Sequence, residues 1–150
     1  MARFKLPSSW LVALQFGLIG ALLLTSWPPS EDAPLPAALA MLLAAAVIGV
    51  AALMANKPGN FNIQPELKSN ARLVTSGIYR CIRHPMYSAV LLAMLAAMLA
   101  DPRGWRVAVW LGLLAVLSAK AQREEGYLQQ RFAQYGQYRA RTWRLLPWLW

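Results

Sequence analysis

Four runs of apolar residues divide the chain, and short polar segments separate them. The runs are Trp10–Trp27, Pro34–Ala55, Met86–Ala100 and Trp105–Ala121. The first two hold 18 and 22 residues, enough for about 27 and 33 Å of helix against about 30 Å of hydrocarbon. The last two are shorter, but only "DPRG" separates them. That linker predicts a tight helical hairpin beside the two longer spans.

The pattern predicts an all-α protein, a polytopic membrane helical bundle that forms one domain over residues 1–150. The composition agrees, because 58% of the residues are hydrophobic and only 14% are charged, too few to cover a soluble domain of this size. A cleavable signal peptide is the alternative for the first run, but the run is longer than a usual signal core. The expected transmembrane helices cover residues 10–27, 34–55, 85–101 and 104–122.

The basic residues are distributed unevenly between the two sides of such a bundle. The net charge is +9, and four spans would place thirteen of the fifteen Lys and Arg residues on one side. By the positive-inside rule, both termini and that face are cytoplasmic. We therefore expect a bacterial inner (plasma) membrane protein. Anionic lipids are the expected partners of the basic excess, and nucleic acid is not expected.

The chain has a single cysteine, Cys81. It excludes an intramolecular disulfide, and no spacing of metal ligands accompanies it, so no metal is expected. A lone cysteine is more often a small buried apolar residue than a nucleophile. The sequence does not determine the oligomeric state.

A polar cluster precedes the third apolar run, in "SGIYRCIRHPMY". Pro85 suits the first position of a helix, which makes His84 the expected cap and places Arg83 just before it. The free N–H groups and the positive dipole end at such a helix start suit a carboxylate or phosphate. The alternatives are a purely structural cap for His84 and interfacial anchoring for Tyr79 and Tyr87.

A second polar cluster, "KAQREE", follows the fourth run. We expect the helix to continue beyond the membrane, because Glu125, Leu128, Phe132 and Tyr135 follow a helical spacing. The predicted hairpin is antiparallel, so the two clusters lie at the same level and form a pocket with cationic, aromatic and acidic parts. Aromatic faces there could hold a sulfonium or ammonium. The alternative is an ordinary i, i+4 ion pair between Lys120 and Glu124, of a few tenths of a kcal/mol.

These segments resemble a known family. "LVTSGIYRCIRHPMYSAVLL" and, after another helix, "EEGYLQQRFAQYGQYRARTWRLLP" look like the C-terminal half of the isoprenylcysteine carboxyl methyltransferases, a signature shared by the related membrane phospholipid methyltransferases. The resemblance covers about Asn60 to Pro147. It implies an integral membrane methyltransferase that transfers a methyl group from S-adenosylmethionine to a lipophilic acceptor and releases S-adenosylhomocysteine.

The resemblance also implies a cytoplasmic cofactor pocket under a C-terminal helix and tail. Its cofactor-contacting residues, carried over by position, would be Gln64, Ala71, Arg72, Leu73, Val74, Tyr79, His84, Pro85, Met86, Tyr87 and Glu124.

On the acceptor side, we expect Lys120 or Arg123 to orient a lipophilic substrate that enters from the bilayer, and Glu125 to take a proton where one must leave. Lys120 stands where the carboxyl methyltransferases have an arginine, and Phe132–Ala133 stands where they have Phe-Gly. Lysine offers a point charge instead of a planar fork, so the identity of the acceptor stays open. A related NADPH-dependent membrane reductase of sterols or isoprenoids and a non-catalytic membrane subunit are the two alternative functions.

Overall fold

The structure is a computed structural model that describes residues 8–56 and 72–147. The candidate residues Gln64 and Ala71 lie outside the described residues. Within them there is no β-strand, and one isolated β-bridge pairs Ile82 with Trp143. The elements are α1 (Ser8–Leu24), α2 (Leu35–Ala55), the short 3-10 helix η1 (Gly77–Arg80), α3 (Pro85–Ala100), α4 (Gly104–Arg131) and α5 (Tyr135–Ala140).

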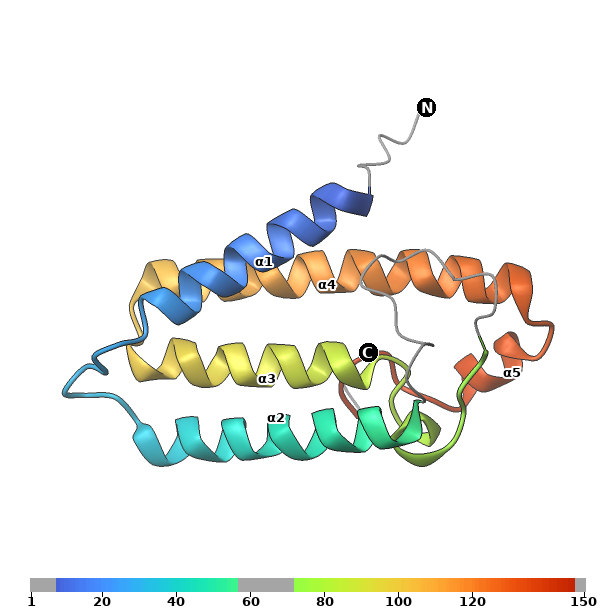
Figure 1. Ribbon diagram of the computed structural model, residues 1–150, viewed down its shortest axis with the longest axis horizontal. Coiled ribbons are helices and arrows are strands. Elements are labelled where there is room, and N and C mark those ends of the chain that lie inside the picture. The colour runs from blue at the N-terminus through green and yellow to red at the C-terminus, as the bar shows by residue number, and fades with distance from the viewer. Residues whose placement is uncertain (1–7, 57–71, 148–150) are drawn as a thin grey trace.

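The four long helices run lengthwise through the molecule and alternate in direction (Figure 1). α3 lies between α2 and α4, and α1 crosses α4 at an angle (Figure 1). η1, α5 and the tail after α5 gather at the end where α3 begins and α4 finishes (Figure 1). This arrangement confirms the expected all-α bundle and its C-terminal helix.

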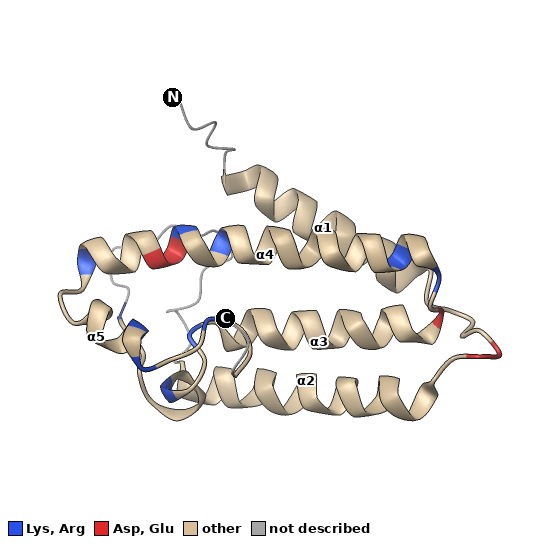
Figure 2. Cartoon of the chain, turned by 180° about the vertical axis from the view of Figure 1, so that it is seen from behind, with Lys and Arg blue, Asp and Glu red and all other residues tan. Residues whose placement is uncertain are grey.

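The middle of the bundle contains no charged residue among the described helices. α1, α2 and α3 carry none, and α4 carries none between Arg106 and Lys120. The Lys, Arg, Asp and Glu residues lie toward the two ends (Figure 2). α2 and α4 are long and apolar enough to cross a membrane, whereas α1 and α3 are shorter apolar helices of 17 and 16 residues. The count of four spans therefore stays a prediction for α1 and α3.

Two helix ends differ from the predicted ones. α1 finishes at Leu24, before the predicted end at Trp27, because side chains after it bond back to its last turn: the Thr25 hydroxyl donates to the Ala21 carbonyl at 2.6 Å and the Ser26 hydroxyl to the Leu23 carbonyl at 2.8 Å. Prolines follow at positions 28 and 29, and they have no N–H with which to continue a helix.

α4 does continue beyond its apolar part, as predicted, but it ends at Arg131. The predicted helical series through Phe132 to Tyr135 is wrong. Phe132 has an extended backbone (φ −118°, ψ 110°), and Tyr135 begins a separate helix, α5. The break allows the chain to turn back, so that α5 and the tail reach the start of α3.

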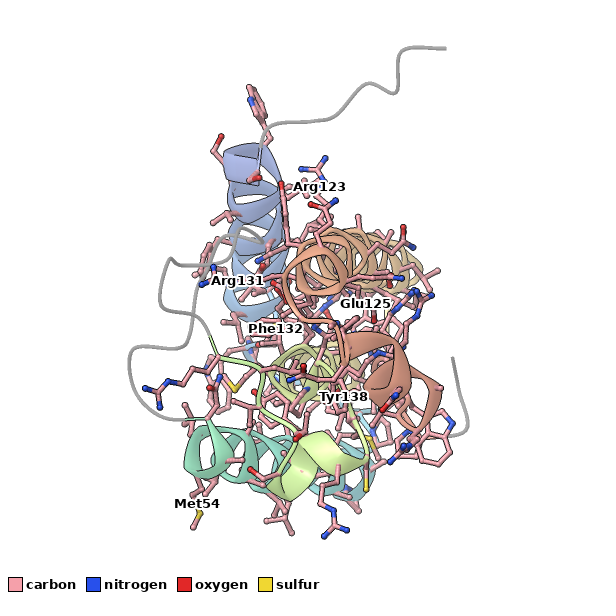
Figure 3. The ribbon with its side chains drawn as sticks, turned by 90° about the vertical axis from the view of Figure 1, so that its right-hand side faces the viewer. Met54, Arg123, Glu125, Arg131, Phe132 and Tyr138 are labelled. Atoms are coloured by element: carbon pink, nitrogen blue, oxygen red, sulfur yellow. The ribbon has the colours of Figure 1, made fainter. Side chains whose placement is uncertain are left out.

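Small residues bring α2 close to α3. Ala38, Ala45 and Ala52 are the buried residues of α2, and a Cβ added to Gly49 would lie 3.7 Å from the Ala89 Cβ. Small residues of this kind permit close helix contact in membranes. The opposite face of α2 exposes large apolar side chains, including Met54 (Figure 3), as expected of a surface that faces lipid.

Arg106 joins three segments at the end of the bundle opposite α5. Its guanidinium is fully buried and donates to the Thr25 carbonyl at 3.0 Å, the Leu22 carbonyl at 2.8 Å and the Ala97 carbonyl at 2.6 Å. Asp101 lies 3.5 Å from it. The carbonyls at the ends of α1 and α3 have no partners within their own helices, and the arginine satisfies several of them.

We expect Arg106→Met to lower the free energy of unfolding by about 3 kcal/mol, because it leaves buried carbonyls at the ends of α1 and α3 without their donor. Arg103→Met is the matched control, since the Arg103 side chain is 70% exposed and should contribute at most about 1 kcal/mol. Unfolding of the two variants in detergent measures both losses of stability. Equal stabilities of the two variants would contradict the role of Arg106.

Candidate functional site

The segment before α3 is held in place by the tail after α5. Pro85 begins α3 and His84 is its N-cap residue, as predicted. The Trp143 N–H donates to the Cys81 carbonyl at 2.9 Å, the Arg83 N–H to the Trp143 carbonyl at 2.8 Å, and the His84 N–H to the Arg144 carbonyl at 3.1 Å. The tail therefore runs beside the start of α3.

The short helix η1 forms another wall of the candidate site, next to the start of α3. Gly77 starts it with a positive φ of 58°, and a Cβ at this position would lie 2.9 Å from the Ala55 Cβ. Only glycine combines that backbone with so close an approach. Tyr79 follows within η1 and is buried, and its carbonyl accepts a hydrogen bond from the Tyr138 hydroxyl at 2.7 Å. η1 is thereby attached to α5.

The carboxylate of Glu125 is the centre of an ion-pair network. It lies one turn beyond the apolar part of α4 and is 3% exposed. Arg83 Nε donates to its Oε1 at 2.9 Å, and Arg144 reaches Oε1 at 3.2 Å and Oε2 at 3.1 Å. Exposed Arg139 lies 3.8 Å away. Burial alone would raise the pKa of Glu125, but His84, Arg144 and Arg83 together lower it.

His84 lies between two carboxylates. Its Nδ1 is 3.2 Å from Glu124 Oε2, and its Nε2 is 3.4 Å from Glu125 Oε1 without making a hydrogen bond. Burial alone would lower the pKa of His84, but the two glutamates outweigh it and raise the pKa. A protonated His84 therefore fits this position.

Glu124 and Tyr87 complete the cluster on the side of α3. The Tyr87 hydroxyl donates a hydrogen bond to Glu124 Oε1, and the Tyr87 ring stacks on His84 with centroids 5.5 Å apart. The Glu124 side chain is 20% exposed, whereas that of Glu125 is 4% exposed. Of the two neighbouring acids, Glu124 is thus the one that a ligand can reach.

Lys120 lies one turn earlier on α4 and is 1% exposed. Its ammonium donates to Gln15 Oε1 at 2.6 Å and lies 5.3 Å from the centroid of the Tyr87 ring. A cation at that distance from an aromatic face is attracted by the ring quadrupole. Lys120 therefore belongs to the same cluster as Tyr87 and Glu124.

The open anion site expected at the start of α3 is largely filled by the protein itself. Backbone carbonyls of the tail accept the N–H groups of Arg83 and His84, and the Arg83 guanidinium binds Glu125. It also donates to the carbonyls of Arg139 and Thr142. The acidic group beside the start of α3 is therefore the Glu125 carboxylate of the protein itself.

Arg123, a candidate for orienting the acceptor, lies apart from this cluster. It is half-buried, and two residues along an α-helix place it about 200° around from Glu125. Figure 3 shows the two labelled side chains on different sides of α4. The proton-accepting role predicted for Glu125 finds no support in its contacts, because both carboxylate oxygens are bound by arginines.

The remaining described candidates lie before η1 and in the first turn of α3. Arg72, Leu73 and Val74 form irregular backbone ahead of η1, and Met86 is half-buried in the first turn of α3. A cavity of about 410 Å³ opens nearby, and none of the cofactor candidates that the structure describes lines it. Its walls are Thr75, Arg80, Gln134, Gln137, Tyr138, Arg141 and Thr142.

Sequence reasoning missed Arg144 and Gln15. Arg144 stands among apolar residues in "TWRLLP", and an arginine in such a segment is itself a signal of a buried ion pair. Gln15 is the one polar side chain of α1 after Ser9, and a polar residue within an apolar span is a signal in itself.

The fold and this cluster together define a helical bundle with an acidic and aromatic site under its C-terminal tail. A family model for phospholipid methyltransferases matches residues 36–135, which are 100 of the 150 residues of the chain. The chain therefore belongs to the phospholipid methyltransferase family, as its motifs predicted, and this supports a membrane methyltransferase. No curated protein matches the sequence.

We expect Arg144→Met to lower the free energy of unfolding by about 3 kcal/mol, because it leaves the buried Glu125 carboxylate short of a partner. Arg139→Met is the matched control: Arg139 reaches the same carboxylate at 3.8 Å, but 48% of its side chain is exposed, so the loss should stay below about 1 kcal/mol. Denaturant titration in detergent distinguishes the two. A larger loss for Arg139→Met would refute the network.

The titration of this network predicts an optimum of stability in mildly acidic solution. The pKa of His84 is raised above its ordinary value of 6.5, so its contribution is complete below pH 6.5 and is lost as the pH rises through the folded-state pKa. The pKa of Glu125 is lowered from 4.5, so its contribution is present above pH 4.5 and is lost in stronger acid.

His84→Asn should therefore remove most of the alkaline loss of stability while leaving the acid limb in place. Unfolding of both proteins in detergent from pH 4 to pH 9 tests this. A wild-type curve that is flat above pH 6.5 would show that His84 is not stabilised as a cation.

Proposed function

We propose that this protein is an integral membrane methyltransferase that transfers a methyl group from S-adenosylmethionine to a lipophilic acceptor. The observation that carries the proposal is the Glu124–His84–Tyr87 cluster between α3 and α4, in a chain of the phospholipid methyltransferase family. We further propose that this end of the bundle is cytoplasmic, because eight of the described basic residues, Arg80, Arg83, Lys120, Arg123, Arg131, Arg139, Arg141 and Arg144, lie at or toward it.

The residues of the cluster fit the cofactor. Glu124 is the accessible acid and suits an ammonium or ribose hydroxyls, while the ring of Tyr87, or that of Tyr79 nearby, suits an adenine or a sulfonium. The start of α3 is mostly occupied by internal contacts, so we base the assignment on Glu124 and the rings instead of on the free N–H groups. When bound, S-adenosylmethionine supplies an activated methyl group on sulfur and leaves as S-adenosylhomocysteine.

The part played by the protein is alignment and exclusion of water. Methyl transfer is an in-line displacement at an activated carbon, so a site that holds both reactants in register supplies most of the catalysis. Lys120 lies on the apolar side of Glu124 and is the residue we assign to orienting the acceptor. A lipophilic acceptor would approach between the helices from the bilayer, and anionic lipids would lie against the basic end.

Glu125 has a structural role in this proposal. Its arginine partners keep it ionised, as its lowered pKa indicates, and they hold the tail over the site. The carboxylate that remains accessible for a ligand is Glu124.

We expect Glu124→Gln to weaken binding of S-adenosylhomocysteine at least tenfold, because it removes a charge-assisted contact of about 1.5–3 kcal/mol. Isothermal calorimetry in detergent measures the affinity. Glu31→Gln, an exposed acid at the other end of the bundle, is the matched control and should bind like the wild type. Wild-type affinity for Glu124→Gln would defeat the assignment of the site.

The same titration discriminates between the alternative functions. A heat of binding with S-adenosylhomocysteine and none with NADPH supports the transferase function, whereas the reverse result indicates the reductase function. Binding of neither compound indicates a non-catalytic subunit. Transfer of radiolabelled methyl groups to a total membrane lipid extract, followed by mass spectrometry of the product, then identifies the acceptor.

A further inference from the structure

Two arginines line the cavity of about 410 Å³ beside α5, and none of its described lining residues is acidic. Arg80 is the last residue of η1, and Arg141 directly follows α5. The other walls are polar and aromatic side chains from the segment before η1, from α5 and from the tail. Pockets that bind small molecules have volumes of roughly 300–1,000 Å³. Two cations therefore border a space that is large enough for a small ligand.

Neither of the two guanidinium groups has a partner within the described part of the protein. Arg80 and Arg141 are exposed, and neither side chain makes a hydrogen bond or an ion pair with any residue that the structure describes. The Glu125 carboxylate at this end of the bundle is already bound by Arg83 and Arg144. Two like charges at one cavity repel each other, and an anion between them relieves that repulsion. The cavity therefore suits an anionic ligand.

The backbone that carries the two arginines is held in place by internal hydrogen bonds. The Tyr138 hydroxyl donates to the Tyr79 carbonyl at 2.7 Å, which joins α5 to η1. The Arg83 guanidinium donates to the Thr142 carbonyl, one residue after Arg141. A ligand that binds here does not have to order these segments, and preorganisation of this kind favours binding.

The position of the cavity indicates a membrane lipid as the source of the anion. η1 packs against the last turn of α2, because a Cβ added to Gly77 would lie 2.9 Å from the Ala55 Cβ. α2 is long and apolar enough to cross a membrane. Near this end it exposes Val50, Leu53 and Met54, the last of which is labelled in Figure 3. Apolar surface for acyl chains thus lies on the helix next to η1.

We propose that this cavity binds the phosphate of an anionic phospholipid between the guanidinium groups of Arg80 and Arg141. Each guanidinium is a planar fork of donors that matches phosphate oxygens. The side-chain amides of Gln134 and Gln137 line the same cavity and supply further donors.

Such a site differs from a general attraction of lipids to the basic end, which Figure 2 shows as a gathering of Lys and Arg positions. It holds one headgroup at a fixed place and connects η1 with α5. It is also separate from the cofactor cluster, so lipid binding does not depend on the proposed methyl transfer.

The test measures the unfolding temperature of the full chain in an uncharged detergent while lipid is added, without any cofactor. Phosphatidylglycerol is the probe, and we expect it to raise the unfolding temperature, because a ligand that binds only the folded state stabilises it. Phosphatidylcholine carries a phosphate but no net charge, and glycerophosphoglycerol is the phosphatidylglycerol headgroup without acyl chains. Both should have a much smaller effect at the same concentration. An equal effect of glycerophosphoglycerol would overturn the lipid as the source, and an equal effect of phosphatidylcholine would overturn the selection of an anion.

The double variant Arg80→Gln with Arg141→Gln tests the residues of the site. It should weaken phosphatidylglycerol binding by about tenfold or more, because it removes two charge-assisted contacts. Without lipid it should unfold at the wild-type temperature, since neither guanidinium has an internal partner among the described residues.

Arg123→Gln with Arg131→Gln is the matched control. It removes the same two charges at the same end of the bundle, from residues that do not line the cavity. We expect its affinity for phosphatidylglycerol to stay within about twofold of the wild type, because distant exposed charges are largely screened by salt. Equal weakening in the two double variants would show that only net charge attracts the lipid. That result would overturn the site, as would wild-type affinity in Arg80→Gln with Arg141→Gln.

Discussion

A buried carboxylate, that of Glu125, holds together parts of the chain that are far apart in sequence. An ionised carboxylate away from water is strongly unfavourable unless several donors surround it. Arg83 reaches it from the segment before α3, and Arg144 reaches it from the tail after α5. The Arg83 contact needs only the α3–α4 hairpin, whereas the Arg144 contact forms only when the chain turns back after α4. The break of the helix at Phe132 and the position of the tail are therefore both needed to bring Arg144 to the buried Glu125 carboxylate.

The functional site depends on the same constraint. With Glu125 surrounded by cations, the neighbouring Glu124 is left on the accessible side, next to His84 and Tyr87. One acid thus maintains the structure while the adjacent one is available to a ligand. Lys120 extends this arrangement toward the apolar part of the bundle, where α1 contributes Gln15. The site consequently draws on helices from both ends of the sequence.

The sequence predicted the parts of this structure that depend on periodicity and chain direction. Apolar runs located the helices, Pro85 located the start of α3, and the antiparallel hairpin placed His84 beside the two acids. It did not predict which acid would be buried, because that depends on Arg144, 19 residues away beyond an unforeseen turn. The Gln15–Lys120 contact has no periodic signal at all, since a single hydrogen bond between distant helices leaves none.

The most direct test is a disulfide between the two paired segments in the membrane. Cysteines at Ile82 and Trp143, the residues joined by the β-bridge, would be introduced with Cys81→Ser and oxidised in native membranes. We predict rapid, nearly complete cross-linking that Glu125→Gln strongly reduces. No cross-link, or one that is indifferent to Glu125→Gln, would show that this carboxylate does not hold the tail over the site.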